Sequence, residues 1–232
     1  MRKVLIPLFA SLFVLGTVSV AAPLSLPIIN SDFDDSPGSG PFGWTGGAPS
    51  GWGAIGNVGV FNPTIYELSK GSYTGHDGSD VALVYSDGGV LGQWLTGVSP
   101  ATGRTYTLSV QAAGRIGLYE DATYKLRLVA GTTDYSQWVE LAISDPFTPV
   151  EGVFQESNLS YSPTSLNPAY SVLGINLLVF GASIPDQVLF DNVSLENHVN
   201  DSGNSVPDSS VFLLLGPSLV GLGIVGRRKF SR

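Results

Sequence analysis

Within residues 104–112, polar and apolar side chains alternate from Thr105 onward, and this pattern restricts the fold more than any other stretch. Successive side chains of a β-strand point to opposite faces, so one face of this stretch enters a core and the other meets solvent. The apolar face consists of Tyr106, Leu108, Val110 and Ala112. The stretch therefore predicts a half-buried strand.

Strand patterns recur along the chain and are separated by turn residues, which include many of its 29 Gly and 15 Pro. Residues 172–180 are apolar apart from Asn176, as in a strand that is covered on both faces. Two apolar runs, 81–85 and 90–95, flank a Ser-Asp-Gly-Gly turn and predict a hairpin. We predict an all-β fold, a two-sheet antiparallel sandwich, over residues 23–196.

The N-terminus has the pattern of a secretory signal peptide. Arg2 and Lys3 precede an apolar run, 4–18, and small residues follow up to Ala22. This order predicts export with cleavage after Ala21 or Ala22. A permanent N-terminal anchor is the alternative.

The C-terminus has the pattern of a membrane-sorting tail. A polar stalk, 197–205, leads to a short motif, and then to an uncharged segment, 211–226, that predicts a short transmembrane helix. The basic end, 227–232, predicts that the upstream domain lies on the extracytoplasmic side. The motif consists of Val206, Pro207, Asp208, Ser209 and Ser210, and the basic stop of Arg227, Arg228 and Lys229.

This tail resembles the PEP-CTERM class of bacterial sorting signals, in its VPDSG-like variant. Ser210 stands where that variant has Gly. The resemblance implies an exosortase-type processing protease as a partner, membrane attachment through the C-terminal helix, and presentation at the cell surface or in extracellular polymer. A plain C-terminal anchor is the alternative.

Charge is distributed unevenly along the chain. Of 11 basic residues six lie in the two ends, and of 19 acidic residues only Asp208 does, so the middle carries a net charge of −13. Such an acidic surface disfavours nucleic acid as a partner. The absence of cysteine means that no disulfide holds the fold.

Several short stretches in the middle resemble jelly-roll, galactose-binding-like domains of the kind found in carbohydrate-binding modules. They are residues 30–34, 43–44, 77–83, 105–110 and 189–195. The resemblance implies a jelly roll and a structural calcium ion between the first and last strands, where carboxylates and amides supply oxygen ligands. The implied ligands are Asn30, Asp32, Asp34 and Asp191, although the family pattern has Glu at the position of Asp34. The alternative is that these side chains cap turns.

Exposed aromatic rings beside polar groups are typical of a glycan site. Trp52, Tyr119, Tyr135 and Trp138 are the candidates. For Trp44 and Trp94 a place in the core is the stronger interpretation.

Motifs for catalysis are absent from the sequence, which has two His, no HExxH and no phosphate-binding loop. We therefore expect a non-catalytic protein that binds glycan. The alternatives are a structural surface or matrix protein and, third, a glycoside hydrolase.

Overall fold

The computed structural model describes residues 22–35, 43–63, 73–75, 80–85, 87–117, 122–181 and 187–200. Their strands are β1 (Leu24–Ser25), β2 (Trp44–Gly46), β3 (Gly53–Ile55), β4 (Val58–Phe61), β5 (Val81–Val84), β6 (Val90–Leu95), β7 (Arg104–Gly114), β8 (Thr123–Gly131), β9 (Trp138–Ile143), β10 (Gln155–Tyr161), β11 (Val172–Phe180) and β12 (Val188–Val199).

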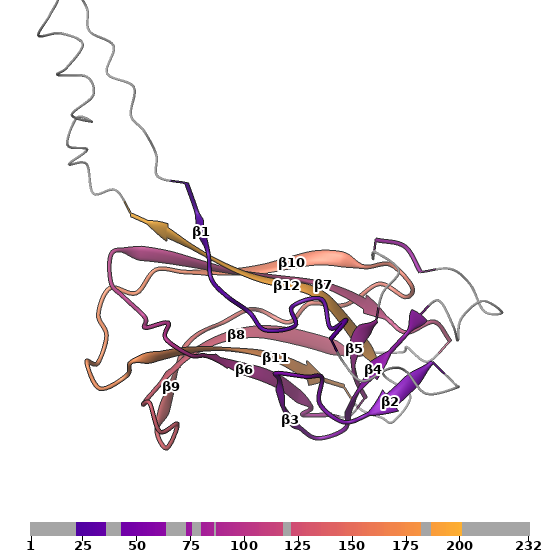
Figure 1. The fold of residues 1–232 in the computed structure, drawn as a ribbon. Coiled ribbons are helices and arrows are strands. Elements are labelled where there is room, and N and C mark those ends of the chain that lie inside the picture. The colour runs from indigo at the N-terminus through magenta and orange to yellow at the C-terminus, as the bar shows by residue number, and fades with distance from the viewer. Residues whose placement is uncertain are drawn as a thin grey trace, which may run out of the picture. The chain divides into compact units, whose positions relative to one another are not determined.

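The strands form two antiparallel sheets that face each other (Figure 1). The seven-stranded sheet has the order β10-β7-β12-β5-β4-β2, with β1 paired to β12. The five-stranded sheet has the order β3-β6-β11-β8-β9. The expectation of an all-β, two-sheet sandwich is confirmed, and so is the expectation that the first and last strands are neighbours.

The main core lies between the sheets, because alternate positions of the long strands point inward. Tyr106, Leu108 and Val110 of β7 meet Leu126 and Leu128 of β8 within one buried cluster. The alternation expected for residues 104–112 is therefore confirmed.

A second, smaller cluster covers the outer face of the seven-stranded sheet. Val81 and Leu83 of β5 point into this cluster, while Ala82 and Val84 point into the main core. Phe61, Tyr73 and Phe154 complete the cover. Strand β5 is consequently buried on both faces, as its uninterrupted apolar sequence allows.

Two expectations about this region are wrong. Strands β5 and β6 do not form a hairpin, because β5 pairs with β4 and β12 whereas β6 pairs with β3 and β11 in the other sheet. The turn after β5 therefore carries the chain from one sheet to the other. Strand β12 also continues to Val199, so the first part of the expected stalk is paired with β7.

The expected signal peptide, 1–22, lies outside the described residues except for Ala22, and the expected sorting motif, C-terminal helix and basic stop lie outside them entirely, in 201–232. Within the ranges given above, no helix has the length and apolar character needed to cross a membrane.

Candidate functional site

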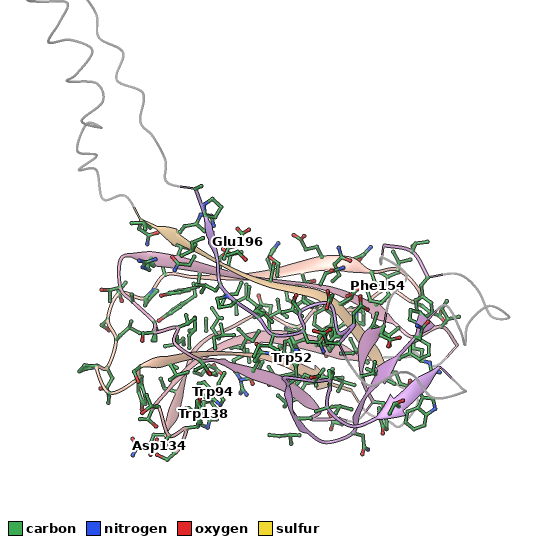
Figure 2. All side chains as sticks on the ribbon, viewed as in Figure 1. Trp52, Trp94, Asp134, Trp138, Phe154 and Glu196 are labelled. Carbon is green, nitrogen blue, oxygen red and sulfur yellow. The ribbon has the colours of Figure 1, made fainter. Side chains whose placement is uncertain are left out.

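A groove with a volume of about 720 Å³ lies on the outer face of the five-stranded sheet. Strands β6, β11 and β8 form its floor. Strand β9 and the turn before it form one side, and strand β3 with the preceding segment forms the other. Figure 2 shows Trp94 and Trp138 on this side of the sheet, away from Trp52, which lies between the sheets.

The floor follows from strand register. Trp94 of β6, Gly174 of β11 and Val129 of β8 are direct cross-strand neighbours and share the outer face. One row further along, Asn176 of β11 lies between Gly92 and Arg127. An indole ring can spread over this floor because its neighbours on β6 and β11 carry no side chain.

Aromatic rings form one wall. Tyr135 packs on Trp94 with ring centroids 5.4 Å apart and an interplanar angle of 31°. Trp138 is exposed over 52% of its surface and lies beside the Arg127 guanidinium, whose central carbon is 5.1 Å from the ring centroid. Aromatic faces bind flat apolar rings and attract positive charge, and here the Arg127 guanidinium already lies against the Trp138 ring.

The turn that carries Tyr135 is held by one carboxylate. Asp134 accepts hydrogen bonds from the hydroxyls of Thr132 and Ser136 and from the Ser136 backbone N–H. These bonds, with the Thr132 hydroxyl first, hold the pKa of the exposed Asp134 carboxyl below its usual value of 3.8. Tyr135 itself adopts φ of +58°, an uncommon conformation for a bulky residue.

Arg127 and Glu140 bring opposite charges to the same side. The Arg127 Nη1 lies 3.8 Å from Glu140 Oε2. The Arg127 Nε is buried and makes no hydrogen bond within the described part of the chain. The groove therefore combines an apolar aromatic surface with the Arg127 guanidinium, and the Glu140 carboxylate lies beside the groove as the partner of that guanidinium.

Gln93 holds the segment that forms the other side of the groove, opposite the aromatic wall. Its side chain points away from the groove floor, accepts from the Ile29 N–H at 2.8 Å, and donates to the carbonyls of Ile29 and Gly51 at 2.9 and 3.0 Å. This bridge ties the segment before β3 to β6. The segment 51–53 then lines the groove.

The predicted ligand-binding aromatics differ in burial, although the segment of Trp52 borders the same groove. Trp52 is a core residue, only 6% exposed, whose Nε1 donates to the Asn30 carbonyl and whose ring packs on Phe33. Tyr135 and Trp138 line the groove together, and Tyr119 lies outside the described residues.

The expectation that Trp94 lies in the core is wrong, because its side chain lines the groove on the outer face of the sheet. Leu91 and Leu95 of the same strand point into the core, and Trp94 has the opposite parity. This alternation in the sequence predicts that the Trp94 side chain lies on the outer face.

Three of the predicted calcium ligands lie in the loop 30–34 and the fourth, Asp191, lies on β12, and each accepts a hydrogen bond from a backbone N–H. Asn30 accepts from the Asp35 N–H, Asp32 from the Asp34 N–H, and Asp34 from the Asp80 N–H. Asp191 is fully buried and accepts from the Asn192 N–H at 2.7 Å. No group of three or more His, Cys, Asp or Glu side chains able to hold a metal occurs in the ranges that the structure covers.

Solved structures with this fold include cyclases from Fischerella. A Stig cyclase, Fisc, from Fischerella sp. TAU in complex with (3Z)-3-(1-methyl-2-pyrrolidinylidene)-3H-indole is 24% identical, with a TM-score of 0.59 over 78% of this chain and 100% of that one. A cyclase from Fischerella sp. TAU in complex with 4-(1H-indol-3-yl)butan-2-one is also 24% identical, with a TM-score of 0.59 over 77% of this chain and 100% of that one. At these identities the likeness establishes the fold. A sequence comparison with curated proteins gives no match.

The HpiC1-like family, described as HpiC1 cyclase, matches residues 24–196. This match corrects the assignment to PEP-CTERM proteins with a carbohydrate-binding domain, because it covers nearly the whole sandwich with a family of enzymes. It also overturns the expectation of a non-catalytic glycan-binding or structural protein, and with it the exosortase, glycan and membrane partners. The chain belongs to the HpiC1-like family of cyclases.

Proposed function

We propose that this protein is a cyclase that closes a ring within a small aromatic molecule bound in the outer groove. The groove carries the proposal, because it joins three aromatic rings to the Arg127 guanidinium, with Glu140 paired to that guanidinium beside the groove, in a chain of the HpiC1-like cyclase family. Its volume of about 720 Å³ falls in the range typical of small-molecule sites.

Ring closure needs a bound conformation in which two distant carbons of one molecule meet. A flat ring held on Trp94 and Tyr135 leaves a flexible side chain free to fold back toward Trp138 and Arg127. Fixing the reacting carbons in contact supplies much of the rate acceleration that such a reaction needs.

The chemistry is redox-neutral. An alkene in the side chain takes up a proton, the resulting cation accepts an electron pair from a ring carbon, and a new carbon–carbon bond forms as the ring carbon loses a proton. The faces of Trp94 and Tyr135 would stabilise the cation, and Tyr135, which lines the groove, and Glu140, which pairs with Arg127 beside it, are the candidate groups for proton exchange.

Binding tests the site directly. Isothermal titration calorimetry with 4-(1H-indol-3-yl)butan-2-one should show binding to the full chain, and Trp94→Ala should weaken it about tenfold or more. Trp44→Ala is the matched control, since Trp44 is 43% exposed on β2 of the other sheet. Equal binding by the two variants would exclude the groove as the site.

Turnover tests the reaction. Indoles with alkenyl side chains, incubated with the full chain, should give products of unchanged mass and altered chromatographic retention. A complete lack of conversion across such a panel, with binding intact, would refute the cyclase proposal.

We also propose a structural calcium ion at the loop 30–35, beside Asp191. Support comes from the carboxylate and amide oxygens of this loop, which are possible calcium ligands. The Val193 N–H donates to the Ser31 carbonyl and holds the loop against β12. EDTA should lower the melting temperature of the full chain, and added calcium should restore it. A melting temperature that EDTA leaves unchanged would refute the structural calcium ion.

Finally, we propose that the protein is exported and that its sandwich lies on the extracytoplasmic side. Support comes from the charged, apolar and small-residue segments of residues 1–22. Mass spectrometry of the mature protein should find an N-terminus at Ala22 or Pro23. An intact Met1 in the native protein would contradict export by this route.

A further inference from the structure

The Trp94 indole lies where it does because two outer-face positions under it are glycine. A methyl group at Gly174 would lie 2.7 and 2.9 Å from Cε3 and Cζ3 of the ring, and 2.8 Å from Cγ2 of Val129. A methyl group at Gly131 would lie 2.7 Å from Cη2 and 3.0 Å from Cζ3. Carbon atoms that are not bonded do not approach this closely, so a side chain at either position displaces the ring.

The direction of this displacement is fixed by the sheet. The backbones of β11 and β8 lie below the ring, and Val129 closes the space beside Gly174. The ring is also held on one side by Tyr135. Its remaining way out is into the groove, which would become shallower.

We propose that Gly174 and Gly131 determine specificity by setting the depth of the groove, so that the site favours flat ligands of two or more fused rings over single rings. This inference rests on the proposed function, because it concerns the same groove. A ligand with fused rings covers both Trp94 and Tyr135, whereas a single ring covers one of them. Raising the floor therefore removes more contact from the larger ligand.

The matched control is Gly46→Ala. Gly46 is also a strand glycine beside a tryptophan, but a methyl group there would lie 3.5 Å from Cζ3 of Trp44, an ordinary contact, and on the other sheet. Gly174→Ala and Gly131→Ala disturb Trp94, whereas Gly46→Ala leaves it unchanged.

Two readouts separate this inference from the cyclase proposal, and neither requires turnover. The indole N–H resonance of Trp94, assigned with Trp94→Phe, should shift in Gly174→Ala and Gly131→Ala and stay in place in Gly46→Ala. Calorimetry should show indole binding weakened about tenfold or more by Gly174→Ala, and phenol binding changed less than about twofold. Thermal unfolding of each variant confirms that the sandwich is intact.

An unshifted Trp94 resonance in Gly174→Ala would overturn the inference, and so would equal losses for indole and phenol. Failure of the wild-type chain to bind indole would overturn it as well. The cyclase proposal fails on a different result, the absence of any isomerised product.

Discussion

Gln93→Leu should be among the most destabilising substitutions of a polar residue in this protein. The Gln93 side chain is 6% exposed and makes three hydrogen bonds to backbone groups of Ile29 and Gly51. A hydrogen bond of this kind contributes about 1 kcal/mol, and a buried backbone group left without a partner costs about 1–3 kcal/mol. The added apolar burial offsets about 1 kcal/mol of the loss. We expect unfolding to become easier by about 2–4 kcal/mol.

Urea unfolding measures this loss. With a slope of about 2 kcal/mol per molar, the midpoint should fall by about 1–2 M while the slope stays constant. Gln155→Leu on the exposed side of β10 is the control and should change the midpoint little. A loss below about 0.5 kcal/mol for Gln93→Leu would refute the view that this side chain braces the segment beside the groove.

Gln93→Glu sharpens the test. The carboxyl would keep the bond from the Ile29 N–H but would face two carbonyl oxygens in place of the amide that donated to them. Burial and these carbonyls would raise the folded-state pKa of the introduced carboxyl above its unfolded value of about 4.3. The variant should therefore come closest to wild-type stability below that pH, and fall behind as pH rises through the raised value. A stability difference that is independent of pH would contradict this account.

Two further predictions concern titratable groups. Because the hydrogen bonds from Thr132 and Ser136 lower the pKa of Asp134, their contribution is complete above pH 3.8 and is lost as pH falls through the lowered value. Tyr135 ring resonances should shift in that window in the wild-type chain and stay constant in Asp134→Asn. Burial raises the pKa of Tyr124 above 10.0, so its contribution to stability is present below pH 10.0 and is lost as pH rises above it. Tyr124→Phe, which removes the bond to Ser157, should show a smaller alkaline loss in thermal unfolding; an equal loss would assign the effect to another group.

The pattern of polar and apolar residues was sufficient to predict most of the strands. The alternation of residues 104–112 is a property of the strand itself, and it placed the inward face of β7 correctly. The turn between β5 and β6 was not predictable in the same way. Its glycines suit a hairpin, but Val81 and Leu83 need cover on the outer face as well, and this holds β5 in the centre of the other sheet.

The tryptophans show why a site is harder to predict than a strand. Trp52 lies in a Gly-rich stretch that reads as an exposed loop, yet its ring fills space beside Phe33 and its N–H reaches the Asn30 carbonyl. Both partners lie about twenty residues earlier in the chain, and the sequence around Trp52 does not predict these contacts. Burial of this ring depends on how the loops close the edge of the sandwich.

For Trp94 the opposite holds: the local sequence predicts the direction of its side chain, but it does not predict that the side chain forms part of a groove. Alternation along β6 puts Trp94 on the face opposite Leu91 and Leu95, so its outward direction follows from the sequence. An outward tryptophan becomes the floor of a groove only if its neighbours across the sheet are small, and Gly174 and Gly131 belong to strands 80 and 37 residues further along the chain. Strand order therefore turns three unrelated positions into one surface. It follows that relatives of this chain with the same alternation in β6 but larger residues opposite Trp94 should keep the fold and lose the groove.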